Sequence, residues 1–320
     1  MMYFPPQPPT YRVEASNANG TRENTFTYAL HLPRPVVVRP PVVHAETIKT
    51  SNGEDIVTLW IPRRGNTPQS RRADDTTLLF SHGNATDLGI CFPVLDRLAV
   101  ALGVNIFAYD YSGYGGSTGK PSPKNTNADI EAAYEYLRSK YPQQSQKVIL
   151  YGQSLGTALS VYLGSKLCLK GDTAVAGAIL HSPLMSALRC LRDIEQTKWY
   201  DVYPSIDDIK NITFPIFLIH GKEDADIPIH HTFGLLANAQ VPYEPWYAES
   251  CGHNDIEAVH PVLYRQKLQA FIDDVRDGKA NRFADSIRAR LHATLPSHSL
   301  SPVVPSSDEA PSSAGVMSSR

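Results

Sequence analysis

The sequence holds a five-residue pattern that suits a nucleophilic serine. Residues 152–156 read GQSLG, with an apolar run before them at 148–151 and an apolar, small-residue stretch after them from about 157. A tight strand-to-helix turn holds a serine clear of other side chains, and glycines on both sides let strand and helix approach. The alternative is a glycine-flanked turn with an ordinary capping serine. The buried strand before the pattern and the helix after it favour Ser154 as a nucleophile.

A nucleophilic serine needs a base that takes its proton and an acid that orients the base. Candidate loops follow two predicted strands, HGKEDADIP at 220–228 and AESCGHND at 248–255. Among the eleven histidines, only His253 follows a strand after the acidic loop with a glycine beside it, so we expect His253 to be the base. Serine, carboxylate and then histidine is the chain order of α/β-hydrolases. Spacing alone leaves three carboxylates open as the acid: Glu223, Asp224 and Asp226.

Two backbone N–H groups are expected to bind the oxyanion that forms during attack. One is that of Leu155, at the start of the helix, and the other is that of Asn84, in the loop after the strand 77–80. The alternative for Asn84 is a simple turn, which asparagine tolerates well. Three other histidines close strands, and we expect structural hydrogen bonds from them: His82, His181 and His220.

A zinc site is the other chemistry that the histidines suggest, through His230, His231 and a carboxylate. Neighbouring histidines on a helix diverge, which disfavours a shared metal ion. Hydrolysis by an activated serine also needs no cofactor. We therefore expect neither a metal nor a cofactor.

Strands and helices alternate along the part of the chain that carries these residues. The predicted strands are 45–50, 55–62, 77–80, 104–109, 148–151, 175–180, 216–219 and 243–247, and the predicted helices are 90–102, 127–140, a helix from about 157, and 259–275. The turn 51–53 joins the first two strands as a hairpin. Such alternation predicts a mostly parallel sheet with helices on both faces, with the catalytic groups at the carboxyl ends of the strands. The irregular segment 181–204 would form a short cap.

Composition limits the class of protein. The chain has 320 residues, a formal charge of −2 and four widely spaced cysteines, and it has no C-x-x-C pair. These features predict no affinity for nucleic acid and no disulfide framework, and they suit a reducing compartment. No apolar run approaches the length of a membrane span, and the start lacks the layout of a secretory signal. We expect a proline-rich extended segment at 1–43, one hydrolase domain at 44–278 and a disordered Ser/Pro-rich tail at 296–320.

Five longer segments together resemble one family. They are SHGNATDLG at 81–89, NIFAYDYSGYGGSTGKPSPKN at 105–125, ILYGQSLGT at 149–157, AILHSPLMSALR at 178–189 and CGHNDIE at 251–257. In this order they resemble the α/β-hydrolase domain-containing protein 17 family, membrane-associated serine hydrolases that remove palmitate from cysteines of other proteins. The resemblance runs from about Met2 to Ile272. Position by position, it implies an α/β-hydrolase fold with Ser154 as nucleophile, Asp224 as acid and His253 as base.

The resemblance also implies a substrate and a location. The substrate would be S-acylated proteins. The protein would be cytoplasmic, with peripheral contact to the cytosolic face of a membrane. We also expect it to be a monomer. That family has a lipidated cysteine cluster at its N-terminus, whereas the first cysteine here is Cys91. Either this anchor is absent or the chain as given lacks its first residues. The cap offers three candidate acyl contacts: Leu184, Met185 and Leu188.

Two alternative functions stay open, one catalytic and one not. A carboxylesterase or acylglycerol lipase would use the same machinery on oxyesters. A non-catalytic scaffold at the cell cortex would bind partners through the proline-rich ends, although the intact set of Ser154, Asp224 and His253 counts against it.

The segment 279–295 allows two readings. Apolar residues recur every four positions at Phe283, Ile287 and Leu291, with three arginines alongside at Arg282, Arg288 and Arg290. The first reading is a weakly membrane-binding basic helix that partly replaces a missing anchor. The second, which we favour, is a surface helix that packs its apolar side on the domain.

Overall fold

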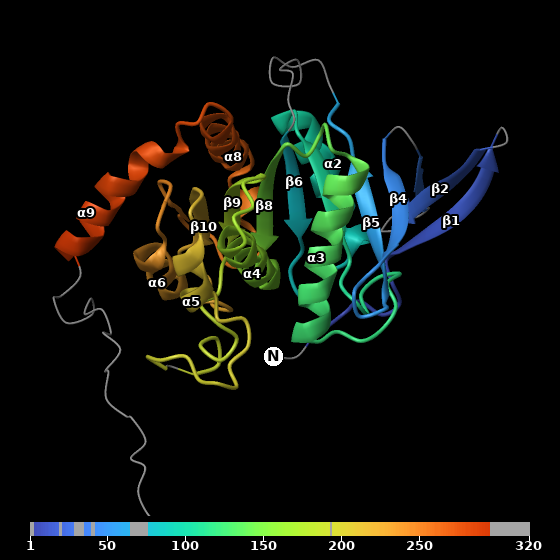
Figure 1. Cartoon of the computed structure of the whole chain (residues 1–320). Coiled ribbons are helices and arrows are strands. Elements are labelled where there is room, and N and C mark those ends of the chain that lie inside the picture. Colours follow the sequence, from blue (N-terminus) through green and yellow to red (C-terminus); the bar gives the residue numbers. More distant parts are fainter. Residues whose placement is uncertain are drawn as a thin grey trace, which may run out of the picture.

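The centre of the protein is an eight-stranded sheet with the order β11-β10-β9-β8-β6-β7-β5-β4 (Figure 1). The computed structural model describes residues 3–18, 21–28, 35–39, 42–64, 76–192 and 194–294. The strands are β4 (His44–Lys49), β5 (Asp55–Ile61), β6 (Thr76–Ser81), β7 (Asn105–Tyr109), β8 (Lys147–Gln153), β9 (Val175–His181), β10 (Ile216–Gly221) and β11 (Trp246–Ala248). β4 and β5 pair antiparallel, as do β5 and β7, and every other pair is parallel. The predicted α/β-hydrolase fold is confirmed.

Helices cover both faces of this sheet. They include α2 (Leu88–Leu102), α3 (Pro123–Lys140), α4 (Leu155–Leu169), α6 (His230–Asn238) and α8 (Pro261–Arg276). α2 and α8 share one core cluster, whereas α3, α4 and α6 pack into the other. Two helices begin earlier than predicted because of their caps. Asp87 accepts the N–H groups of Gly89 and Ile90 at the start of α2, and Ser122 caps α3, whose first residue is a proline.

Three strands in the described parts of residues 11–38 depart from the extended lead-in that was predicted over 1–43. They are β1 (Tyr11–Ala18), β2 (Thr21–Tyr28) and β3 (Val36–Val38), which form an antiparallel sheet with the order β1-β2-β3. The ring of Phe26 lies 5.1 Å from that of Tyr11 and 5.2 Å from that of Phe92 in α2, measured between centroids. Tyr11 and Phe26 are buried in the same core cluster as α2. Prolines on both sides obscured the strands between them.

The cap joins β9 to β10. Over residues 182–204, its described part has no regular helix or strand, and α5 (Ser205–Asp208) and η1 (Ile209–Asn211) follow it. The cap is therefore short, as predicted.

The segment after β11 packs onto the domain. α7 (Ile256–Val259) and α8 replace the single predicted helix, and η2 (Ala280–Phe283) and α9 (Ala284–Thr294) follow. Ile287 is buried, and Leu291 packs against the same core cluster. The three arginines form ion pairs, Arg282 with Asp274, Arg288 with Asp285 and Arg290 with Glu244. The second reading of this segment therefore holds, because its apolar side faces the domain. The predicted tail at 296–320 lies outside the described residues.

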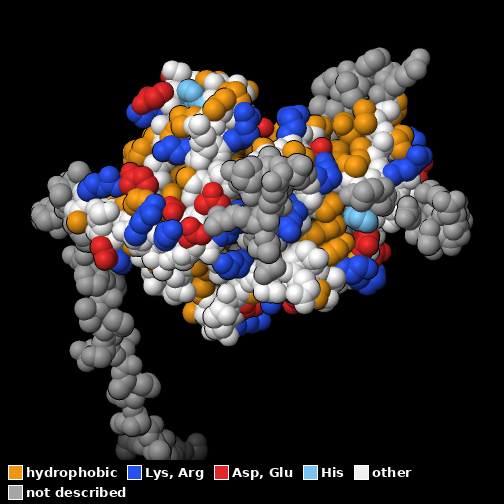
Figure 2. Space-filling view, turned by 90° about the horizontal axis from the view of Figure 1, so that it is seen from above, with side chains coloured by type: hydrophobic (Ala, Val, Ile, Leu, Met, Phe, Trp, Pro, Cys, Tyr) orange, Lys and Arg blue, Asp and Glu red, His pale blue; other side chains and the backbone are white. Residues whose placement is uncertain are grey.

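The surface is mixed in charge. Figure 2 shows Lys and Arg side chains interspersed with Asp and Glu over the face seen from above, in keeping with the formal charge of −2. Among the helices of the described ranges, none combines the length and apolar character that crossing a bilayer requires.

Candidate active site

Ser154 lies in the turn between β8 and α4. Its backbone adopts φ 51° and ψ −116°, a conformation that non-glycine residues rarely occupy. A Cβ on Gly152 would overlap the backbone of Gly156, and a Cβ on Gly156 would overlap the backbone of Ser81. Glycine is therefore the residue that fits at both positions, which gives the predicted pattern its physical cause. The strained turn presents the Ser154 hydroxyl at the carboxyl end of the sheet.

His253 approaches Ser154 from the loop after β11. Its Nε2 lies 2.8 Å from Ser154 Oγ, and its Nδ1 lies 2.7 Å from Asp224 Oδ2. A carboxylate only accepts hydrogen bonds, so Nδ1 carries the proton and Nε2 is left to accept from the serine hydroxyl. The structure thus brings the three predicted residues into one hydrogen-bonded chain, which suits proton removal from the serine.

Asp224 lies in a loop that holds its carboxylate from several sides. Its Oδ1 accepts the backbone N–H groups of Asp226 at 3.0 Å and Ile227 at 2.8 Å. Burial raises the pKa of Asp224, but hydrogen bonds from His220, His253 and the Ile227 N–H hold it well below the usual range. The carboxylate is therefore ionised beside the imidazole at neutral pH. Hydrogen bonding, and not spacing, distinguishes Asp224 from Glu223 and Asp226, whose side chains are exposed.

His220 is a support for Asp224 that the sequence did not reveal. Its Nε2 lies 3.1 Å from Asp224 Oδ2 and 2.7 Å from the carbonyl oxygen of Ile227. A carbonyl only accepts, so Nε2 carries the proton, while Nδ1 lies 2.6 Å from the Thr232 hydroxyl. The prediction of a structural histidine at a strand end was too general, because this one fixes the acid.

The two expected oxyanion donors flank Ser154. Leu155 is the first residue of α4, and the loop with Gly83 and Asn84 lies against the turn, since a Cβ on Gly83 would be 3.6 Å from that of Ser154. Tyr114 Oη donates to Asn84 Oδ1 at 2.6 Å and holds this loop in place. The arrangement suits two backbone N–H groups that converge on one oxygen, and their role stays a prediction.

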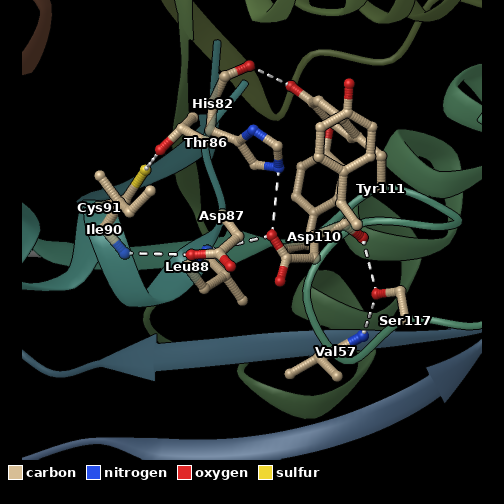
Figure 3. A network of polar contacts seen from close by, with 12 residues as sticks. Val57, His82, Thr86, Asp87, Leu88, Ile90, Cys91, Asp110, Tyr111 and Ser117 are labelled. Atoms are coloured by element: carbon tan, nitrogen blue, oxygen red, sulfur yellow. Dashed lines mark hydrogen bonds and ion pairs between the residues drawn. The ribbon is translucent and has the colours of Figure 1, made fainter. Parts of the chain in front are cut away.

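A second histidine–carboxylate pair lies behind that loop (Figure 3). His82 Nε2 is 3.2 Å from Asp110 Oδ1, and both side chains are fully buried. His82 Nδ1 donates to the Gly83 carbonyl at 2.7 Å, and the ring of Tyr111 stacks on the imidazole with centroids 4.0 Å apart. This network holds the loop that carries Asn84.

A cavity of about 420 Å³ opens beside the serine turn, a volume typical of small-molecule sites. Residues adjacent to the chain of hydrogen bonds line part of it, namely Gly83, Asn84, Gln153 and Asn254. Its apolar wall comes mostly from α2: Phe80, Ile90, Cys91, Val94 and Leu95. Sequence reasoning missed this cavity because the apolar pattern of α2 signals core packing and does not reveal which side chains border a cavity.

The three residues predicted as acyl contacts in the cap do not line this cavity, and their contact with an acyl chain stays a prediction. Leu184 is fully buried in the core, and neither it nor Met185 nor Leu188 lines the cavity beside Ser154. The cap folds back on α5, where the Ile206 N–H donates to the Met185 carbonyl at 2.9 Å. This contact directs the segment into the domain.

Of the two histidines considered for zinc, His231 has a ring nitrogen that is already engaged in a hydrogen bond. His231 Nδ1 accepts the Met185 N–H at 3.0 Å, and burial lowers the pKa of His231 to about 4, with His230 adding to the effect. Within the described ranges, no group of three or more His, Cys, Asp or Glu side chains is arranged to hold a metal ion.

Comparison with known proteins gives one family. Residues 76–194 match a family model described as alpha/beta hydrolase fold. The chain is 43% identical to human alpha/beta hydrolase domain-containing protein 17B over 220 residues, which are 68% of this chain and 72% of that protein. It is 46% identical to the 17C protein of Xenopus laevis over 197 residues, 61% of each chain, so that match spans less than two thirds of the relative.

Solved structures share the fold at low identity. An esterase of Pyrococcus furiosus has a TM-score of 0.59 and 18% identity, over 72% of this chain and 89% of the esterase. A serine hydrolase without lid from Xanthomonas campestris has a TM-score of 0.53 and 17% identity, over 74% of this chain and 96% of that chain. These similarities concern the arrangement of strands and helices alone.

Proposed function

The chain belongs to the α/β-hydrolase domain-containing protein 17 family, and on this premise we propose that it is a serine hydrolase that cleaves acyl thioesters. The expected substrate is palmitate on cysteines of other proteins, as the family resemblance implies. The observation that carries the reaction class is the hydrogen-bonded chain from Ser154 through His253 to Asp224.

The first half of the reaction forms an acyl-enzyme. Ser154 Oγ attacks the thioester carbonyl carbon while His253 Nε2 takes the hydroxyl proton. The negative charge of Asp224 stabilises the imidazolium that results. Backbone N–H groups of Asn84 and Leu155 bind the oxyanion. When the tetrahedral intermediate collapses, the C–S bond breaks and His253 returns the proton to the departing sulfur.

The second half releases the fatty acid. Water takes the place of the thiol, and His253 Nε2 removes its proton as the water oxygen attacks the ester carbon. Collapse of this second intermediate breaks the bond to Ser154 Oγ, which regains a proton from His253.

The cavity beside the turn is where we propose that the acyl chain lies. Its apolar wall includes Ile90, Val94 and Leu95. Gly83 and Gln153, which lie next to Ser154, also line it. Transfer of an apolar chain from water to such a wall lowers its free energy. If so, Val94→Trp should slow hydrolysis of a palmitoyl thioester far more than that of an acetyl thioester.

Exposed apolar side chains in the cap support peripheral contact with a lipid surface. Trp199 is 94% exposed, Leu191 73% and Tyr200 57%. Tryptophan and tyrosine favour the membrane–water interface, where S-acylated cysteines also lie. Sedimentation with phosphatidylcholine vesicles should be reduced in Trp199→Ala, and equal sedimentation of both proteins would count against this contact.

Two assays test the function in order. Wild-type protein should be labelled covalently by a fluorophosphonate probe, and Ser154→Ala should not be labelled. Failure of the wild type to react would support a non-catalytic scaffold. Turnover of palmitoyl thioesters is then compared with that of short oxyesters and acylglycerols, and a preference for either oxyester would replace the thioester proposal.

A further inference from the structure

An N-terminal segment crosses the loop that carries Asn84. We call residues 3–11 the strap. Four of its polar contacts, in chain order, are Tyr3 Oη with Tyr203 Oη at 2.6 Å, the Phe4 N–H to Asn84 Oδ1 at 2.9 Å, the Thr10 N–H to Asp87 Oδ2 at 2.8 Å and Tyr11 Oη to Asp110 Oδ2 at 2.5 Å. We call the loop 82–87, which carries Asn84, the oxyanion loop. The strap therefore connects the cap, the oxyanion loop and the start of α2.

The C-terminal end of the strap, Thr10 and Tyr11, is hydrogen-bonded to two buried carboxylates, which Figure 3 shows beside His82. Asp87 accepts from Thr10 and also caps α2. A Cβ on Gly89, in the first turn of α2, would lie 3.0 Å from the backbone of Thr10. Glycine at this position lets the strap pass directly against the helix. Asp110 is the carboxylate that pairs with His82, so Tyr11 joins the strap to the network behind the oxyanion loop.

The N-terminal end of the strap contacts the oxyanion loop through Phe4. Asn84 Oδ1 accepts three hydrogen bonds, from the Phe4 N–H at 2.9 Å, the Ala85 N–H at 3.0 Å and Tyr114 Oη at 2.6 Å. Ala85 has a φ of 56°, which costs free energy in a non-glycine residue and must be held by its surroundings. Among these three donors, that of Phe4 is the one that comes from outside the segment 82–114.

We propose that the strap is a positioning element of the active site, which sets the Asn84 peptide through the Phe4 N–H. The proposal rests on the proposed function, since its effect is exerted on the oxyanion. Without this hydrogen bond the backbone amide of Asn84 rotates. Its N–H then no longer points at the oxygen on which negative charge develops. A displaced donor weakens binding of the transition state more than binding of the substrate.

A pair of substitutions at position 4 tests this directly. Phe4→Pro removes the backbone N–H, and Phe4→Ala is the matched reference, because it also removes the ring but keeps the N–H. Phe4 is half-exposed, and proline residues already follow it, so both variants should fold. Relative to Phe4→Ala, Phe4→Pro should lower kcat by roughly 10- to 100-fold with an unchanged KM and an unchanged unfolding temperature.

A trifluoromethyl ketone with an alkyl chain distinguishes positioning from a structural role. Such a ketone forms a tetrahedral adduct with serine and carries an oxyanion. Its affinity should fall in Phe4→Pro by the same factor as kcat. A purely structural role would lower the unfolding temperature and leave the affinity of the folded protein unchanged.

A double-mutant cycle identifies the route of the effect. Asn84→Ala keeps its own backbone N–H but removes the acceptor of the Phe4 hydrogen bond. In this background Phe4→Pro should change kcat by less than about twofold. An undiminished effect there, or equal kcat in the two position-4 variants, overturns the proposal. Fluorophosphonate labelling distinguishes failure of the strap proposal from failure of the proposed function. A wild type that does not react contradicts the proposed function, whereas a wild type that reacts leaves the position-4 variants to test the strap.

Discussion

Two histidine–carboxylate pairs at the carboxyl ends of the central strands differ in their surroundings. The His253 side chain is 11% exposed and its Nδ1 lies 2.7 Å from Asp224 Oδ2, whereas His82 and Asp110 are both fully buried at 3.2 Å. In the first pair the second imidazole nitrogen faces the Ser154 hydroxyl. In the second pair it donates to the backbone carbonyl of Gly83. The same two residue types therefore serve a hydroxyl in one place and a loop in the other.

The pKa values of the two carboxyls move in opposite directions. Burial raises the pKa of Asp110, and hydrogen bonds from His82 and Tyr11 do not compensate for it. Burial acts on Asp224 as well, but two imidazoles and backbone N–H groups outweigh it and lower its pKa. The set of donors around a carboxylate, its neighbouring histidines included, decides against burial which form is favoured. A pair suited to catalysis is one whose acid stays ionised beside a base that reaches solvent.

The largest expected effect comes from removing the imidazole of the exposed pair. His253→Ala should lower kcat by about 10⁴- to 10⁶-fold, since no group remains to take the serine proton. His230→Ala, at an exposed histidine outside the pair, is the control and should retain activity. Hydrolysis of a chromogenic thioester measures both. Comparable turnover in His253→Ala and wild type would show that the exposed pair is not the catalytic one.

The next effect tests the acid. Asp224→Asn should lower kcat by about 10³- to 10⁴-fold, because an amide leaves the wrong imidazole tautomer facing Ser154. Asp226→Asn provides a matched control in the same loop, since its side chain is exposed. Equal losses in the two variants would contradict the assignment of Asp224 as the partner of His253.

How far the sequence predicted this site depends on the range of each contact. The serine turn was predictable because Gly152, Ser154 and Gly156 act within five residues. Spacing left the acid open among three carboxylates of one loop, since the hydrogen bonds to Ile227 and His220 that distinguish Asp224 depend on the folded loop. The family resemblance alone pointed to Asp224. The strap has no local signal at all, because its contact to Asn84 spans 80 positions.

Breaking the buried pair should affect stability first. Asp110→Asn leaves His82 without its carboxylate in a site closed to water, and should lower the free energy of unfolding by about 3 kcal/mol. Urea denaturation followed by tryptophan fluorescence measures this. The fall in kcat at 25 °C should remain at least about tenfold smaller than that of Asp224→Asn. Unchanged stability in Asp110→Asn would mean that the pair does not hold the loop.

The smallest effect concerns another buried carboxyl, that of Asp129 in α3. It accepts the N–H and the hydroxyl of Ser112, each at 2.7 Å, yet burial raises its pKa to about 7. The unfolded chain releases this proton near pH 4, so between about pH 4 and 7 the native state binds more protons. The contribution of this carboxyl to stability is thus complete below pH 4 and is lost as the pH rises to 7.

Asp129→Asn removes the titration and should change the pH dependence in one direction. The variant's free energy of unfolding minus that of the wild type should be larger at pH 8 than at pH 5, so the variant is relatively more stable at pH 8. Urea denaturation at both pH values measures this. Asp226→Asn, with its exposed side chain, is the control for an added amide. The same difference from wild type at both pH values would mean that Asp129 is already ionised in the native protein at pH 5. Burial would then not dominate at Asp129, and the contrast with Asp224 would apply to Asp110 alone.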